Sequence, residues 1–418
     1  MIRVIGDIIL DVWIKGKLDR NSPEADAKIL DQQVENFNLG GASNVAANLK
    51  DLNCNIKIYG AISRDSSGKK ILKILNKKKI SKFIDYSLEI TSTKTRFIKH
   101  ENKHVLRLDN EKFQKTYRCE KKLINECKKN DLIILVDYSK GIIQKNKISK
   151  IIKKNSNVFV DPKNYAEFYK GAFLVKPNMK RLKMWTNNTF NKDKCFELLK
   201  KMKWTWLVIT DGSKGVHVFN KHKIYKHFTT KTNRLRDVSG AGDTFMASLV
   251  YYFNKGLDIF KSSELACLAA TKVVEKKEVQ TISENEILFE TVFTNGVFDI
   301  LHKGHYQLIK FCKAIGKKLV VAINTDESVK KIKGPKRPYN QLKIRIKNLK
   351  KNKLIDKVVT FKNKTPINLI KKIKPSVIVK GGDYSKQKVV GGKFTKVIIF
   401  PSVGNYSTTK ILKKMNKR

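Results

Sequence analysis

A glycine-rich segment, Asp237 to Phe245, holds the residue types that phosphoryl transfer requires. It leads directly into an apolar run at residues 246–253, which predicts a tight turn that opens a buried helix. Gly240 and Gly242 have no Cβ, so backbone N–H groups there can point at an anion, and the helix dipole adds positive charge. Asp243 would place a carboxylate beside that anion, where it can take a proton from an attacking hydroxyl. A turn that only caps a core helix is the simpler alternative, but the combined features favour phosphoryl transfer.

A second segment places His302 and His305 three residues apart, with Gly304 between them. This spacing puts both imidazoles on one face of the first turn of a helix. A predicted strand at residues 291–295 and a glycine turn precede them. Two imidazoles and helix N-terminal amides suit the charge that builds on an α-phosphate under attack. Two histidines that line a core are the alternative, but the order of strand, turn, histidines and helix favours nucleotidyl transfer.

The elements that must position the first segment follow an α/β pattern. Strands are predicted at residues 2–6, 56–60, 132–136, 158–160, 173–175 and 207–209. Helices are predicted near residues 66–79, 116–129, 144–154 and 191–202. Short apolar strands that alternate with helices indicate a parallel sheet, and ligands bind at the carboxyl ends of such strands. The polar residues at these ends are Asp7, Asp137, Asp161, Asn178 and Thr210.

Two further regions of the first half have strand character. Residues 9–37 contain Pro23 and little helical periodicity, so we expect short strands and a loop that form a lid. Residues 86–108 are rich in Thr, Ile, Phe and Val and also predict strands. Between these regions, residues 39–49 predict a glycine turn followed by a helix of small residues, which can lie close to a sheet or a ligand.

The pattern restarts at about residue 285, so we expect two domains, at residues 1–284 and 285–418. Strands are predicted at residues 319–324 and 377–379. The basic loop from Lys333 to Pro338 could cover a triphosphate, or it could be an ordinary solvated loop.

Composition narrows the class of protein. The chain has 418 residues and a formal net charge of +51. Its lysines are spread along the whole chain, whereas a nucleic-acid surface concentrates charge and uses Arg, so we expect no nucleic-acid partner. There is no apolar run long enough for a membrane helix and no signal peptide at the N-terminus. The six cysteines form no CxxC pair, which favours free thiols in the cytoplasm over a metal site.

The first half resembles the ribokinase-like (PfkB) sugar kinases over about residues 1–283, with Asp237 to Phe245 as the family signature. This resemblance implies a parallel-sheet domain with a small β lid, ATP with Mg²⁺ that has no direct protein ligand, and a homodimer. Asp243 would be the base. The implied ATP-binding residues are Asn178, Thr210, Gly212, Gly215, Gly240, Ala241 and Gly242. The implied sugar-binding residues are Asp7, Asp11, Gly40, Gly41 and Asn44.

Three positions depart from the pattern of this family. Arg181 stands where an Asn-x-x-Glu motif that begins at Asn178 would place the glutamate that helps to set magnesium and phosphate. Cys267 stands where we expect asparagine, and Glu278 lies in place of a small, glycine-containing loop. An arginine cannot hold magnesium through a water shell, although it can contact phosphate directly.

The second half resembles the cytidylyltransferase-like nucleotidyltransferases over about residues 291–418, with a Rossmann-like fold. His302 and His305 would stabilise the transition state. The implied nucleotide-binding residues are Thr294, Gly296, Phe298, Gly304, Lys333, Arg337, Ser407, Thr408 and Thr409.

The two halves in this order resemble the bifunctional heptose-7-phosphate kinases and heptose-1-phosphate adenylyltransferases. The resemblance implies phosphorylation of heptose 7-phosphate at the anomeric hydroxyl, followed after a separate phosphatase by adenylyl transfer to heptose 1-phosphate. The product, ADP-heptose, would supply the lipopolysaccharide core. Three alternatives stay open. The first is the same architecture acting on another sugar phosphate, and the second, because of Arg181, is a kinase half that has lost its activity. The third is a nucleic-acid-binding protein, because of the net charge of +51.

Overall fold

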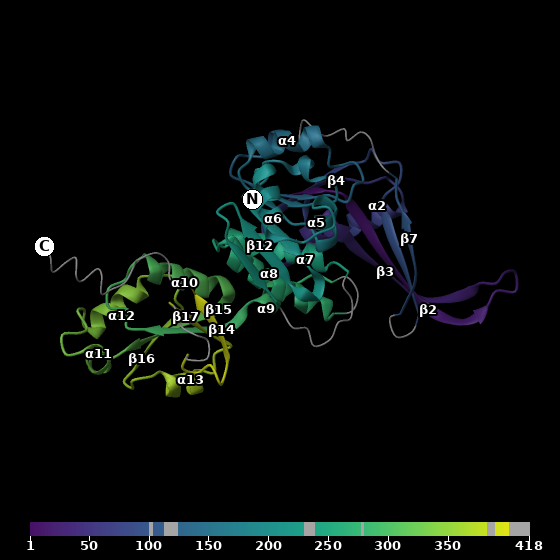
Figure 1. Ribbon diagram of the computed structural model, residues 1–418. Coiled ribbons are helices and arrows are strands. Elements are labelled where there is room, and N and C mark those ends of the chain that lie inside the picture. The colour runs from purple at the N-terminus through teal and green to yellow at the C-terminus, as the bar shows by residue number, and fades with distance from the viewer. Residues whose placement is uncertain (100–102, 113–123, 230–238, 277–279, 383–388, 401–418) are drawn as a thin grey trace. The chain divides into compact units, whose positions relative to one another are not determined.

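The computed structural model describes residues 1–99, 103–112, 124–229, 239–276, 280–382 and 389–400. The chain divides into two compact units, Met1–Glu284 and Asn285–Arg418 (Figure 1). Among the described residues, no helix combines the length and the apolar character needed to cross a membrane.

A nine-stranded sheet forms the centre of the first unit. In spatial order its strands are β13 (Tyr225–Phe228), β12 (Val216–Asn220), β11 (Trp206–Thr210), β10 (Leu174–Val175), β9 (Val158–Asp161), β8 (Leu132–Val136), β1 (Ile2–Gly6), β4 (Ile56–Ala61) and β5 (Ser81–Asp85). All neighbours are parallel except at the edge, where β12 is antiparallel to both β11 and β13. Strand β8 is buried at all five positions, as expected for a parallel strand covered on both faces.

Helices pack on the sheet in two groups. Helices α4 (Lys145–Lys154), α5 (Met179–Trp185) and α6 (Lys192–Lys201) share one apolar core with the sheet. Helix α7 (Ala241–Asn254) packs between α1 (Ala42–Asp51) and α8 (Ile259–Val274). Other described elements of this unit are α2 (Ser66–Lys77) and the 3₁₀ turns η2 (Ala166–Tyr169) and η3 (Gly212–Lys214), while the short α9 (Glu284–Ile287) spans the boundary between the two units. Small residues let α1 pack closely, and its first eight residues are buried.

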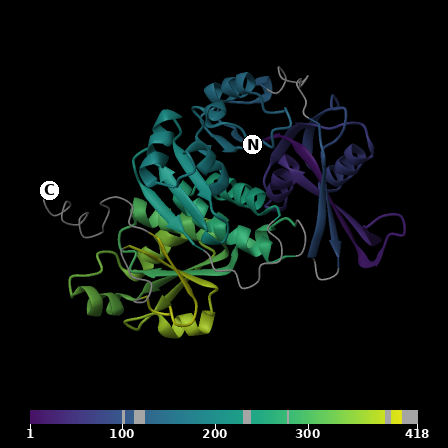
Figure 2. The same cartoon turned by 45° about the vertical axis from the view of Figure 1, so that its right-hand side comes forward.

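The lid is a separate four-stranded sheet in the order β3, β2, β6 and β7. Strands β2 (Ile8–Asn21) and β3 (Lys28–Gly41) have 14 residues each and extend from the body of the unit as a hairpin (Figure 2). The expectation of short strands here was wrong, because antiparallel pairing continues almost to the turn that contains Pro23. Strand β6 (Thr93–Lys99) runs parallel to β2, and β7 (Lys103–Asn110) is antiparallel to β6.

Most predicted elements of the first unit are present, and several observed elements were not predicted, among them β5, α5 and α8. Of the predicted helix at 116–129, residues 124–126 are helical and residues 116–123 lie outside the described residues. The β12–β13 hairpin was missed, because nothing in its sequence separates an antiparallel edge from the alternating α/β pattern around it.

The second unit is built on a five-stranded parallel sheet. Its spatial order is β16 (Lys357–Phe361), β15 (Gly316–Asn324), β14 (Phe289–Gly296), β17 (Val377–Gly381) and β18 (Lys396–Phe400). The helices that follow β14 among the described residues are α10 (Lys303–Ile315), α11 (Asp326–Lys333), α12 (Leu342–Lys350) and α13 (Ile367–Ile373). After β14 the chain adds β15 and β16 on one side of this strand. It then adds β17 and β18 on the other side of β14. Such a reversal marks the crevice where ligands bind, and the predicted histidines follow β14 directly.

Two candidate active sites

The glycine turn before α7 has the geometry that an anion site requires. Gly240 is the N-cap of α7, with φ 76° and ψ −5°, in the left-handed region that favours glycine. Its carbonyl accepts a hydrogen bond from the N–H of Thr244 at 2.9 Å. The N–H groups of the first turn therefore remain available to an anion. Asp237, at the start of the segment, lies outside the described residues.

Asp243 lies in the first turn of α7 and is 5% exposed. Its Oδ2 accepts a hydrogen bond from Asn44 Nδ2 at 2.8 Å, and its Oδ1 accepts one from the Tyr138 hydroxyl at 3.2 Å. Burial, reinforced by the charge of Asp161, raises the pKa of Asp243 to about 7. A carboxyl with a pKa near the working pH is well suited to act as a general base.

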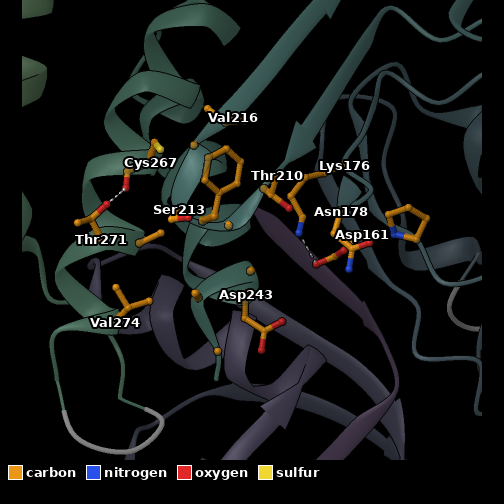
Figure 3. A pocket seen from close by; sticks show the side chains of 18 of the residues that line it. Asp161, Lys176, Asn178, Thr210, Ser213, Val216, Asp243, Cys267, Thr271 and Val274 are labelled. Atoms are coloured by element: carbon orange, nitrogen blue, oxygen red, sulfur yellow. Dashed lines mark hydrogen bonds and ion pairs between the residues drawn. The ribbon is translucent and has the colours of Figure 1, made fainter. Parts of the chain in front are cut away.

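A pocket of about 490 Å³ opens in front of this turn (Figure 3). Its lining includes Asp243 and all seven predicted ATP-binding residues, namely Asn178, Thr210, Gly212, Gly215, Gly240, Ala241 and Gly242. The apolar part of the wall includes Val216, Phe245 and Val274. The structure therefore brings the predicted nucleotide residues together around one cavity.

Sequence reasoning did not assign a role in this site to Lys176. Its ammonium forms an ion pair with Asp161 Oδ2 at 2.9 Å, and the side chain is only 4% exposed (Figure 3). Lys176 Nζ also lies 3.5 Å from the position that a Cβ on Gly242 would take. A cation thus stands at the anion turn itself, where glycine leaves room for it. The sequence feature that could have identified Lys176 is its position directly after a buried strand, at the carboxyl edge of a parallel sheet.

The three departures from the kinase pattern have different positions. Asn178 caps α5, because its side-chain oxygen accepts a hydrogen bond from the backbone N–H of Arg181 at 2.8 Å. Arg181 itself is not among the described residues that line the pocket, whereas Cys267 is. Glu278 lies outside the described residues.

Of the five predicted sugar-binding residues, Asn44 is the one with a described contact to Asp243. Asp7 is 1% exposed and accepts hydrogen bonds from the N–H groups of Tyr138 and Lys140 at 2.7 and 3.2 Å. Burial, together with the charge of Asp137, raises the pKa of Asp7 to about 7.

Asp11 and the two glycines complete this group. Asp11 Oδ1 accepts a hydrogen bond from Arg96 at 2.5 Å. A Cβ on Gly40 would come within 2.4 Å of Asp11 Oδ2. Gly41 has φ +57°, and its Cβ would lie 2.5 Å from the carbonyl oxygen of Asp7. Position 41 therefore requires glycine, whereas a side chain at position 40 would force the Asp11 carboxylate to shift.

The second site is built on the start of α10. His302 is the N-cap residue and His305 lies in the first turn, with the two rings stacked at a centroid distance of 3.9 Å. Neither Nδ1 atom has a hydrogen-bond partner among the described residues. Burial lowers the pKa of both imidazoles, and burial plus the neighbouring His302 lowers that of His305 to about 4. Both rings are therefore neutral at pH 7 and keep one N–H each as a donor.

Four predicted nucleotide-binding residues lie at or near these histidines. The ring of Phe298 is 5.0 Å from that of His305, and Phe298 itself has φ 48°. A Cβ on Gly304 would lie 3.2 Å from the His302 ring, and one on Gly296 would lie 3.2 Å from the Phe298 ring. Thr294, on β14, is fully buried, and its hydroxyl has no partner among the described residues.

The basic loop divides into an anchored part and an exposed part. Arg337 Nη2 forms an ion pair at 2.7 Å with Asp299, which belongs to the turn before the histidines. Lys333 is exposed at the end of α11, and no described contact joins it to the site. Ser407, Thr408 and Thr409 lie outside the described residues.

Arg345 has a structural role that sequence reasoning missed. It is fully buried in α12, where Nη1 donates to the carbonyl of Val297 at 2.9 Å. Its Nη2 donates to Asp326 Oδ1 at 2.6 Å and its Nε to the carbonyl of Asn340 at 2.9 Å. One guanidinium thus joins the turn after β14 to the start of α11 and to the loop that precedes α12. Its position inside an amphipathic helix was the only signal in the sequence.

Comparison with known proteins identifies the family of each half of the chain. Residues 1–286 match the pfkB family of carbohydrate kinases, and residues 293–413 match the cytidylyltransferase-like family. The Bifunctional protein HldE of Nitratiruptor sp. is 33% identical over 99% of this chain and 98% of its own length. The chain belongs to the HldE family. The HldE protein of Sulfurimonas denitrificans is 34% identical over 99% of this chain and 97% of its own length. The HldE protein of Helicobacter pylori is 33% identical over 100% of this chain and 98% of its own length.

Solved structures confirm the fold of the first unit. Phosphofructokinase-2 from Escherichia coli matches 68% of this chain and 97% of its own, with a TM-score of 0.59 and 14% identity. Ribokinase from Thermotoga maritima matches 68% of this chain and 97% of its own chain, with a TM-score of 0.56 and 18% sequence identity. The predicted fold class and the two transferase domains are thereby confirmed. Enzymes of these two kinds generally use ATP together with a divalent metal ion.

Proposed function

We propose that the first unit phosphorylates D-glycero-β-D-manno-heptose 7-phosphate with ATP. In this reaction Asp243 takes the proton of the anomeric hydroxyl, whose oxygen bonds to the γ-phosphorus as the bond to ADP breaks. The N–H groups of the glycine turn and Lys176 offset the charge of the transferring group. The products are the 1,7-bisphosphate and ADP. The single observation that supports this step most strongly is the buried Asp243 beside an open anion turn.

We propose that the second unit transfers AMP from ATP to heptose 1-phosphate. A phosphate oxygen of the sugar attacks the α-phosphorus, ADP-heptose forms and pyrophosphate leaves. The neutral His302 and His305 donate hydrogen bonds to the charge that develops in the transition state. A phosphatase must act between the two steps, because the first product carries a second phosphate.

We propose that Mg²⁺ accompanies ATP in the kinase reaction. Asp161 is the carboxylate beside Lys176 on the pocket wall, and it could hold a hydrated ion that the phosphates bind directly. Among the described residues, no cluster of three His, Cys, Asp or Glu side chains could hold a metal ion without the nucleotide. When bound with ATP, the ion would offset the negative charge of the phosphates.

We propose a homodimer that works in the cytoplasm without nucleic acid. Leu106 and Leu108 on the edge strand β7 are 60% and 54% exposed, which supports association through the lid. The five described cysteines are free, which agrees with a reducing compartment. Sedimentation analysis of wild-type protein and of Leu106→Asp would test the dimer, because a monomeric wild-type chain would reject it.

The test of both reactions is incubation with heptose 7-phosphate, ATP and Mg²⁺, with and without an added phosphatase. We expect heptose 1,7-bisphosphate without the phosphatase and ADP-heptose with it. Activity only with a sugar phosphate other than a heptose would reject the heptose assignment. Adenylyl transfer without any kinase turnover would show instead that the kinase unit has lost its activity.

A further inference from the structure

Tyr138 stands between the catalytic base and the lid. Its hydroxyl donates to Asp243 at 3.2 Å. Two ammonium groups lie over its ring, with Lys94 Nζ at 4.4 Å and Lys163 Nζ at 5.5 Å from the ring centroid. Lys94 belongs to β6 of the lid, whereas Lys163 follows β9 of the main sheet. Two cations from separate parts of the unit therefore converge on one aromatic ring.

The carboxylates near these lysines already have other partners. The ion pairs are Arg96 with Asp11, Arg107 with Asp109, and Lys140 with Glu111. Among the described residues, neither Lys94 nor Lys163 has a carboxylate within ion-pair distance. Three acids are thus matched by three cations, and two lysines at the same place remain in excess.

Holding these two lysines together has an electrostatic cost. Burial lowers the pKa of Lys94, and the charge of Lys163 lowers it further against the opposing effect of Asp11. Burial also lowers the pKa of Lys163, as do Lys140 and Arg181, against the opposing effect of Glu111. Like charges at short range repel unless an anion lies between or beside them. Desolvated cations that have no partner are typical of a binding site.

These cations lie on the sugar side of the base and not on the ATP side. Lys94 is the register partner of Asp11 on β2, so the two residues share one face of the lid. Asp11 is one of the residues expected to bind the sugar. Neither lysine is among the described residues that line the nucleotide pocket, where Lys176 already stands at the anion turn.

We propose that Lys94 and Lys163, across the ring of Tyr138, bind a phosphate group at the end of the sugar remote from the attacking hydroxyl. This inference rests on the proposed kinase function and deepens it, because it makes the kinase selective for a phosphorylated sugar. Each ammonium donates a charge-assisted hydrogen bond to the phosphate. The phosphate in turn relieves the repulsion between the lysines, so binding of the sugar phosphate helps to draw the lid strand towards the base. Arg181 adds to the positive field at the place where a glutamate would weaken it.

The test uses three variants, namely Lys94→Met, Lys163→Met and the variant that carries both changes. The control is Lys99→Met, which changes an exposed lysine on the same strand as Lys94. We expect each single change to raise the KM for heptose 7-phosphate about tenfold or more, since a hydrogen bond between charged groups is lost. The double variant should show the largest increase in this KM. In Lys99→Met the KM for heptose 7-phosphate should change less than about threefold, and in all the variants the KM for ATP should also change less than about threefold. Lys94→Arg should recover part of the loss, because it restores the charge.

The same variants should treat heptose without its phosphate as wild type does, because the lost contact is to the phosphate. An equal loss with phosphorylated and unphosphorylated heptose would overturn the proposal, as would an equal rise in the KM for ATP. The KM for ATP in the kinase reaction, measured on the same samples, identifies any variant whose first unit has not folded.

A second measurement separates this inference from the proposed function. If wild-type protein does not phosphorylate heptose 7-phosphate, the function fails, but the anion site is tested by calorimetry with inorganic phosphate. A non-hydrolysable ATP analogue fills the nucleotide pocket during the titration. We expect wild type and Lys99→Met to bind phosphate, and the double variant to bind it at least about tenfold more weakly. Equal binding by all three proteins, or none by wild type, would overturn the inference.

Discussion

The two candidate active sites use the same physical effect in opposite directions. In the first unit, burial raises the pKa of Asp243 to about 7. In the second unit, burial lowers the pKa of His305 to about 4. Each group is thereby shifted towards its neutral form. In the proposed kinase reaction Asp243 must lose a proton to act as the base, so we expect this reaction to depend on pH near neutrality. In the proposed adenylyl transfer the histidines act as neutral donors, so we expect that reaction to be insensitive to pH in the same range.

The sites also differ in how the chain assembles them. Asn44 and Asp243, which share a hydrogen bond, are 199 positions apart. His302 and His305 belong to a single helix end and need only the turn before it. The second site is thus a local structure, whereas the first depends on the packing of α1 against α7 and on the lid. A comparison of the two half-reactions in one protein therefore separates local from long-range effects.

The largest expected effect is that of Asp243→Asn on the kinase reaction. The amide keeps the shape of the carboxylate but cannot accept the proton, so kcat should fall by about 10²–10⁴-fold. Adenylyl transfer from ATP to heptose 1-phosphate should stay at the wild-type rate. Both rates are measured on one sample, by release of ADP and of pyrophosphate. An unchanged kinase rate would remove Asp243 as the base.

His305→Ala should have the reverse selectivity. Loss of a donor to the transition state should lower the rate of adenylyl transfer by about 10²–10³-fold, with the kinase rate unchanged. His227→Ala, a change of a histidine on β13 of the first unit, is the matched control and should leave adenylyl transfer unaffected. Equal rates for His305→Ala and the control would contradict the assignment.

The pH dependence of the two reactions should differ in the same preparation. Because the pKa of Asp243 is raised, the carboxyl is protonated below about pH 7 and ionised above it. The kcat/KM of the kinase should therefore fall about tenfold per pH unit below pH 7. Adenylyl transfer should vary little between pH 6 and 8, because His305 is already neutral there. Parallel profiles for the two reactions would contradict this difference between the sites.

The smallest expected effect is a shift of the kinase profile in Asn44→Ala. Asn44 donates a hydrogen bond to the ionised Asp243 and lowers its pKa, so removing it should raise that pKa further. The acid limb of kcat/KM should move to higher pH by less than about one unit. Asn53→Ala, an exposed change just after α1, should leave the profile in place. A shift to lower pH would show that Asn44 acts in another way.

The sequence alone predicted the local parts of both sites. Gly240 and Asp243, like His302 and His305, lie together because a turn and one helix end place them there. The alternating apolar strands also indicated the parallel sheet, since a strand such as Leu132–Val136 can only be buried on both faces.

Contacts that depend on distant packing were not predictable in this way. No pattern in the sequence joins Lys176 to the glycine turn or brings Lys94 and Lys163 to Tyr138. The role of Arg345 was missed for the same reason, because its three partners belong to three separate segments, namely two loops and the start of α11. Periodicity reports which face of an element is buried, but it does not report what that face meets.

The central claim is that one chain holds two separate catalytic sites that act in sequence on a heptose phosphate. It is tested most directly by mixing Asp243→Asn with His305→Ala in the presence of heptose 7-phosphate, ATP, Mg²⁺ and a phosphatase, and measuring ADP-heptose. We predict almost no product from either variant alone and strong recovery of product from the mixture. ADP-heptose made by Asp243→Asn alone at the wild-type rate, or no recovery on mixing two folded variants, would contradict the claim.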